Sequence, residues 1–155
     1  MATENQNSNH LLLDTLPSAK GLRFALVVSH WNTEITESLY EGAKNILSQK
    51  NATQIDRIDV PGSFELVYAS RSAIDRGYDA VIAIGSIIRG ETSHFDYVCQ
   101  GVTNGIQQLN ALGKIPIIFC VLTDDNLEQS RARSGGSLGN KGEEAAAAAI
   151  QMARL

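Results

Sequence analysis

Residues 85–94, GSIIRGETSH, hold the densest set of groups that could do chemistry. Gly90 permits a tight turn, and Thr92 can open a helix whose exposed amides favour an anion such as phosphate. His94 would then lie in the first helical turn, where an imidazole titrating near neutrality suits proton transfer. A single histidine is more often a surface or capping residue. The negative charge of Glu91 would oppose an anion unless its side chain points away.

Two further segments could bind polar or planar groups. Trp31, the only tryptophan, follows an apolar run and could stack on a flat heterocycle or cover the edge of the core. In residues 60–65, VPGSFE, the amides at the start of a helix can bind oxygen ligands. Glu65 would either offset the helix dipole or accept hydrogen bonds from sugar-like hydroxyl groups.

Three cations flank the glycine-rich stretch GGSLGNKG near the C-terminus: Arg131, Arg133 and Lys141. Arginine binds phosphate as a fork and lysine as a point charge, although solvated surface charge is the simpler interpretation. The order Gly-Lys-Ser/Thr of nucleotide hydrolases is missing, and no GxGxxG follows the first apolar run. The sequence therefore argues against a nucleotide-hydrolase loop and against a dinucleotide site.

Alternating strand and helix patterns must position these groups. Apolar or alternating runs predict strands at 23–29, 53–60, 79–85 and 115–123. Helices are expected between them, one capped by Thr33 and one capped by Ser63, with further helices before Gly113 and at both sides of the glycine-rich loop. The pattern predicts a three-layer α/β/α, flavodoxin-like fold with a four-stranded parallel sheet in the order 2-1-3-4. Ligands bind such sheets beyond the carboxyl ends of the strands, where the strand order reverses.

Composition excludes several classes of protein. The chain has 155 residues, a net charge of -4, two cysteines and three histidines, and it lacks a close Cys/His cluster. We expect one domain at 21–155 after a flexible arm at 1–20, with no metal, no nucleic-acid partner and no membrane span. The absence of a basic leader and of CxxC spacing predicts reduced thiols and a cytoplasmic location.

Four motifs together resemble the lumazine synthase family from about Leu22 to the C-terminus. They are the pair Trp31-Asn32, VPGSFEL, AIGSIIRGETSHFDYV, and LTDDNLEQSRARSGG followed by GNKGEEAA. The resemblance implies condensation of 5-amino-6-(D-ribitylamino)uracil with 3,4-dihydroxy-2-butanone 4-phosphate, releasing phosphate and water. This is the penultimate step of riboflavin biosynthesis, and the family uses neither a metal nor an organic cofactor.

The resemblance also implies a role for each matching residue. His94 would be the catalytic proton shuttle and Arg133 the main phosphate-binding cation. The other expected substrate-binding residues are Trp31, Asn32, Gly62, Ser63, Glu65, Ser86, Ile87, Ile88, Gly90, Glu91, Thr92, Phe119 and Lys141.

Family resemblance further implies a homopentamer in which Phe119, Arg133 and Lys141 come from the neighbouring subunit. The short glycine-rich loop favours further assembly into an icosahedral shell, although Leu138 departs from the polar residue common in relatives. Riboflavin synthase is then a candidate partner. Two alternatives stay open: a flavodoxin-type module that binds flavin, and a shell protein whose active site has decayed.

Overall fold

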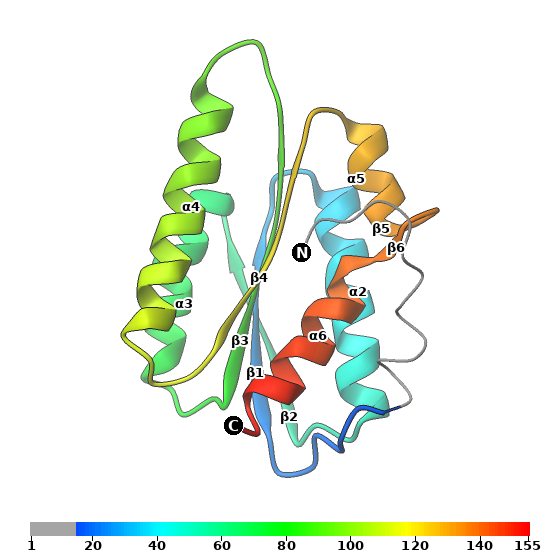
Figure 1. Ribbon diagram of the computed structural model, residues 1–155, viewed down its shortest axis with the longest axis vertical. Helices are drawn as coiled ribbons and strands as arrows, with labels where there is room; N and C mark the ends of the chain where they lie inside the picture. Colours follow the sequence, from blue (N-terminus) through cyan, green and yellow to red (C-terminus); the bar gives the residue numbers. More distant parts are fainter. Residues whose placement is uncertain (1–14) are drawn as a thin grey trace.

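The chain is built around one parallel sheet of four strands, as the sequence predicts. The computed structural model describes residues 15–155. Its strands are β1 (Arg23–Ser29), β2 (Gln54–Val60), β3 (Ala80–Ile88) and β4 (Ile117–Asp124). The order β2-β1-β3-β4 confirms the predicted topology and leaves β2 and β4 at the edges (Figure 1).

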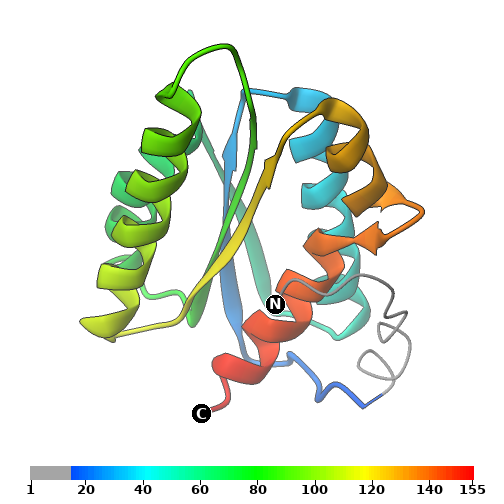
Figure 2. The same ribbon diagram turned by 45° about the horizontal axis from the view of Figure 1, so that its top comes forward.

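Helices cover both faces of the sheet. The helical elements are α2 (Thr33–Gln49), η1 (Ser63–Glu65), α3 (Leu66–Ile74), α4 (His94–Ala111), α5 (Leu127–Arg133) and α6 (Lys141–Met152). Helices α3 and α4 lie on one face, and α2, α5 and α6 lie on the other (Figure 2). A small antiparallel hairpin of β5 (Ser134–Gly136) and β6 (Gly139–Asn140) joins α5 to α6.

The two central strands, β1 and β3, form the buried middle of the sheet. In β1 every residue after Arg23 is buried, and in β3 every residue except Ile88 is buried. Their side chains divide between two hydrophobic clusters, one under α2 and α6 and one under α3 and α4. A strand buried on both faces favours a continuous apolar sequence, which residues 24–28 and 80–84 show.

The structure corrects both predicted helix caps. Thr33 does not cap α2, because Asn32 occupies the cap position and the Thr33 hydroxyl donates to the carbonyl oxygen of His30. Ser63 does not cap α3 either: a short 3-10 turn precedes that helix, and the Ser63 hydroxyl has no hydrogen-bond partner among residues 15–155. Both hydroxyls therefore lie next to strand ends and do not cap a helix.

Two other boundaries differ from the sequence patterns. Strand β3 continues beyond residue 85 through Ile88, because Ser86, Ile87 and Ile88 pair with β4. The segment expected as a glycine-rich loop forms the β5–β6 hairpin, in which Gly135 and Gly139 have positive φ angles. Glycine allows these backbone conformations at little cost.

The described residues begin inside the segment 1–20 that was expected to be a flexible arm. Residues 1–14, with His10 and the leucines at 11–13, lie outside the described residues. In the following stretch, Leu16 and Ala19 are buried in the hydrophobic cluster under α2 and α6. The Ala19 amide donates to the carbonyl oxygen of Lys50 at 2.6 Å. This short stretch therefore packs with the domain.

Candidate active site

A cavity of about 650 Å³ opens at the carboxyl ends of the strands, where the strand order reverses. It lies on the α3–α4 side of the sheet, since residues of η1 and the first turn of α4 form one wall. The predicted site residues that line it are Trp31, Asn32, Gly62, Ser63, Glu65, Ser86, Ile87, Ile88, Gly90, Thr92 and His94.

The floor of the cavity is held by Asn32. This residue has a left-handed backbone conformation with φ of 58°, which asparagine adopts more readily than most residues. Its side-chain amide donates to the carbonyl oxygen of Ser86 at 2.9 Å. The link joins the end of β1 to β3 and fixes the turn that carries Trp31.

Two serine hydroxyls in the cavity lining have no partner. Ser63 and Ser86 are buried, and neither Oγ atom makes a hydrogen bond to another described residue. A buried polar group without a partner costs free energy.

Gly62 lets two functional side chains approach one another. A Cβ atom at Gly62 would lie 3.1 Å from Glu65 Oε2 and 3.3 Å from Trp31 Cδ1. The indole and the carboxylate thus meet over a residue that has no side chain. One wall of the cavity consequently combines a planar aromatic face with a hydrogen-bond acceptor.

His94 is the first residue of α4 and lines the cavity. Its backbone amide lies 3.4 Å from the Thr92 hydroxyl, so the turn before the helix is closed by a local contact. Glu91 is exposed and is not part of the lining. The expectation that Glu91 takes part in substrate binding therefore has no support from the lining.

Sequence reasoning missed four lining residues, which are Phe64, Phe95, Tyr97 and Val98. Three of them lie in the first turn and a half of α4, next to His94, and helical spacing could have found them once His94 was placed at the start of that helix. Three of the four are aromatic and add to the aromatic lining that Trp31 contributes. Such a lining suits a flat ring better than an open polar ligand.

An arginine outside the lining holds the loop between β3 and α4. Arg89 Nε donates to Asp125 Oδ1 at 2.9 Å, and its Nη2 lies 3.3 Å from Asp96 Oδ1. Its guanidinium carbon lies 4.2 Å from the centre of the Phe95 ring. These contacts tie the loop to β4 and to the first turn of α4, so the backbone around Gly90 is fixed on both sides.

The cations predicted for phosphate lie elsewhere in the same chain. Ser134 pairs with Asn140 in the β5–β6 hairpin, and this register brings the flanking residues Arg133 and Lys141 alongside each other. The hairpin lies on the α2–α6 side of the sheet, away from the face that carries the cavity (Figure 2). Neither cation lines the cavity of its own chain.

Phe119 also lies outside the cavity, and its side chain is directed to the face of the sheet opposite to the hairpin. The Cys120 thiol contacts the carbonyl oxygen of Lys141 at 3.7 Å and packs in the cluster under α2 and α6, and successive side chains of a strand point to opposite faces. Phe119 is exposed on the edge strand β4 and does not line the cavity. Arg131, by contrast, is engaged with Glu34 at 2.7 Å, which matches the interpretation as surface charge.

The described part of the chain contains neither a metal-binding cluster nor a membrane-spanning helix. Within residues 15–155, His, Cys, Asp and Glu form no group of three or more that could hold a metal ion. No helix there is long and apolar enough to cross a bilayer.

A parallel α/β sheet with a polar and aromatic cavity at its strand ends is the architecture of a protein that binds a small molecule. Comparison with known proteins identifies the family. The profile of the 6,7-dimethyl-8-ribityllumazine synthase family matches residues 21–155. The chain belongs to this family of riboflavin biosynthesis enzymes.

Individual relatives are similar to this chain over its whole length. The 6,7-dimethyl-8-ribityllumazine synthase of Christiangramia forsetii is 53% identical, with 100% of this chain and 95% of the relative covered. That of Flavobacterium johnsoniae is 56% identical, with 100% of this chain and 83% of the relative covered. The synthase of Porphyromonas gingivalis is 47% identical, with 100% and 98% covered.

Proposed function

We propose that this chain condenses 5-amino-6-(D-ribitylamino)uracil with 3,4-dihydroxy-2-butanone 4-phosphate in the cavity at the strand ends. The observation that carries the proposal is the convergence of Trp31, the unpartnered Ser63 hydroxyl and His94 in one cavity. A planar ring, a polyhydroxyl chain and a proton transfer each need one of these groups. The volume of about 650 Å³ suits two small substrates.

The pyrimidine substrate would lie against Trp31, with its ring edges toward the backbone of Ser86, Ile87 and Ile88. Its ribityl hydroxyls would then meet Ser63 and Glu65. This arrangement supplies the partners that the buried serine hydroxyls lack.

The chemistry begins when the 5-amino group attacks the ketone and water leaves to form an imine. Phosphate is then eliminated, the resulting enol becomes a ketone, and attack by the ribitylamine nitrogen closes the ring with loss of a second water. Each step moves a proton, and His94 is the imidazole placed to carry it. A positioned general acid–base contributes about 10²–10⁴-fold, and holding two substrates together contributes much of the rest.

Phosphate binding would be completed by a neighbouring subunit. Gly90 and Thr92 line the cavity, with Glu91 in the same turn, but the cations Arg133 and Lys141 of the same chain lie on the opposite side of its sheet. We therefore infer a ring in which Phe119, Arg133 and Lys141 of one protomer close the cavity of the next. Such head-to-tail contacts close into rings.

The proposed ring is a homopentamer, and the short β5–β6 connection favours further assembly into an icosahedral shell. Riboflavin synthase, which would consume the product, is the proposed partner. The free thiols Cys99 and Cys120 support a cytoplasmic location.

The test mixes two impaired variants. The purified protein should form a fluorescent lumazine from the two substrates, and His94→Ala and Arg133→Ala should each be impaired. When the two variants are dissociated, mixed and reassembled, some contacts join an intact His94 to an intact Arg133, so part of the activity should return. Absence of lumazine formation by the unaltered protein would refute the function, and absence of recovery in the mixture would refute the shared site.

A further inference from the structure

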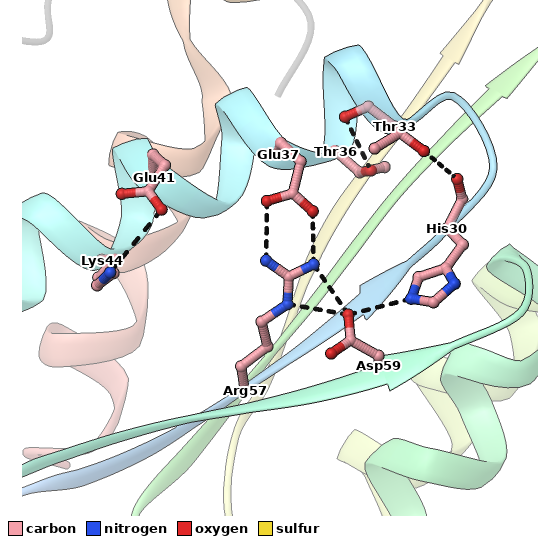
Figure 3. A network of polar contacts seen from close by, with 8 residues as sticks. All are labelled: His30, Thr33, Thr36, Glu37, Glu41, Lys44, Arg57 and Asp59. Atoms are coloured by element: carbon pink, nitrogen blue, oxygen red, sulfur yellow. Dashed lines mark hydrogen bonds and ion pairs between the residues drawn. The ribbon is translucent and has the colours of Figure 1, made fainter.

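A chain of charged side chains runs from α2 across β2 to the turn that carries Trp31 (Figure 3). Arg57 Nη1 donates to Glu37 Oε2 at 2.8 Å, and Arg57 Nε donates to Asp59 Oδ1 at 2.9 Å. Asp59 Oδ1 also lies 3.2 Å from His30 Nε2. The network therefore ends on the residue that directly precedes Trp31.

Arg57 is the fixed centre of this network. Its side chain is 27% exposed, and its guanidinium carbon lies 4.5 Å from the centre of the Tyr40 ring. The guanidinium lowers the pKa of Glu37 and the pKa of Asp59, so both carboxylates stay ionised at neutral pH. Arginine forks that bind two carboxylates and rest on an aromatic face hold a defined orientation.

The backbone of His30 is held as well as its ring. Its amide donates to the carbonyl oxygen of Val60 at 3.0 Å, and its carbonyl oxygen accepts from the Thr33 hydroxyl at 2.7 Å. Trp31 itself is 72% exposed, so packing alone does not set the plane of its indole. The orientation of the indole therefore depends on the backbone of the residues on either side of Trp31.

We propose that the network of Glu37, Arg57, Asp59 and His30 is a positioning device that holds the Trp31 turn in the orientation that stacks on the substrate ring. The inference rests on the proposed role of Trp31 in binding the pyrimidine. None of the four side chains is part of the cavity lining, so they act through the turn and not by touching substrate. Their removal should weaken pyrimidine binding more than the chemical step.

The first experiment uses Asp59→Ala, which separates Arg57 from His30. The KM for the pyrimidine substrate should rise by up to about fivefold, the range of a partly exposed ion pair, while kcat and the KM for the phosphate substrate stay near their original values. Since the chain has one tryptophan, its emission reports on this turn alone. Quenching of that emission by acrylamide should increase as the turn loosens.

Helix α2 offers a matched control. Glu37 and Glu41 lie one turn apart and each pairs with a cation, but Glu41 pairs with Lys44 at 3.8 Å and has no link to the Trp31 turn (Figure 3). Glu37→Gln should raise the pyrimidine KM and the quenching, whereas Glu41→Gln should change neither. This pair also serves if Asp59→Ala folds poorly, since glutamine keeps the shape of the side chain.

A double variant separates failure of this inference from failure of the proposed function. In a Trp31→Ala background, Asp59→Ala should add no further rise in KM, because the network acts through the missing ring. Fully additive effects, or an Asp59→Ala protein indistinguishable from Glu41→Gln, would overturn the positioning role. An unchanged pyrimidine KM in Trp31→Ala alone would instead refute the stacking role, while the quenching measurement would still decide whether the network holds the turn.

Discussion

A Cβ atom on Gly85 would lie 2.7 Å from the Oγ of Ser63. It would also lie 3.0 Å from the Cδ1 atom of Leu66, so the hydroxyl cannot simply move aside without disturbing the start of α3. The absence of a side chain in β3 at this position is therefore what leaves room for the Ser63 hydroxyl. We predict that Gly85→Ala raises the KM for the pyrimidine substrate. Steady-state kinetics would contradict this if both substrates lost affinity equally.

Replacing His94 and Arg133 should damage the reaction in different ways. His94→Ala is expected to lower kcat by about 10²-fold, the lower end of what a general acid–base contributes, with little change in either KM. Arg133→Ala should raise the KM for the phosphate substrate by about 10- to 100-fold, because charge-assisted hydrogen bonds are lost. An unchanged phosphate KM in Arg133→Ala would refute its assigned role.

The ion pair between Glu37 and Arg57 should make stability depend on acidity. Because the guanidinium lowers the pKa of Glu37 below its ordinary value of 4.5, the pair contributes fully above that value. The contribution is lost as pH falls through the lower pKa of the folded state. The pair is partly exposed, so Glu37→Gln should cost less than about 1 kcal/mol at pH 7. Urea unfolding at pH 7 and pH 3 checks this, and a difference between variants that persists in acid would contradict it.

Gly142 marks the closest approach of α6 to α2. A Cβ atom there would overlap the carbonyl oxygen of Leu39, and backbone cannot move aside as a flexible side chain can. Gly142→Ala should therefore destabilise the protein by about 1–3 kcal/mol despite the higher helix propensity of alanine. Glu143→Ala, in the same first turn of α6, is the control. Equal melting temperatures for the two variants would show that the helices can separate without loss.

Periodicity predicted the sheet well. The limits of β1 match the apolar run at 23–29, and the edge position of β2 follows from its alternating sequence. In α2 the apolar residues Ile35, Leu39 and Ala43, which follow helical spacing, are buried. These features depend on side-chain burial, which is written directly into the order of apolar and polar residues.

The sequence predictions that failed concern contacts that the periodicity of apolar residues does not encode. Thr33 and Ser63 are good cap residues by type, but the turns before their helices place other residues at the cap. Tyr97 and Val98 were missed because a helix face becomes a cavity wall only when the sheet beside it is known. The ion network centred on Arg57 joins residues 20 positions apart on two elements, a distance that no local pattern reports.

The amide link from Asn32 to the carbonyl oxygen of Ser86 has an energetic consequence for ligand capture. It ties two strand ends together before anything enters, so the floor beneath the bound molecules is already assembled. A receptor that is ready in this way loses little conformational entropy on association, and more of the intrinsic contact energy remains as affinity. For the proposed two-substrate reaction, the second substrate would then meet a surface that the protein does not have to rebuild.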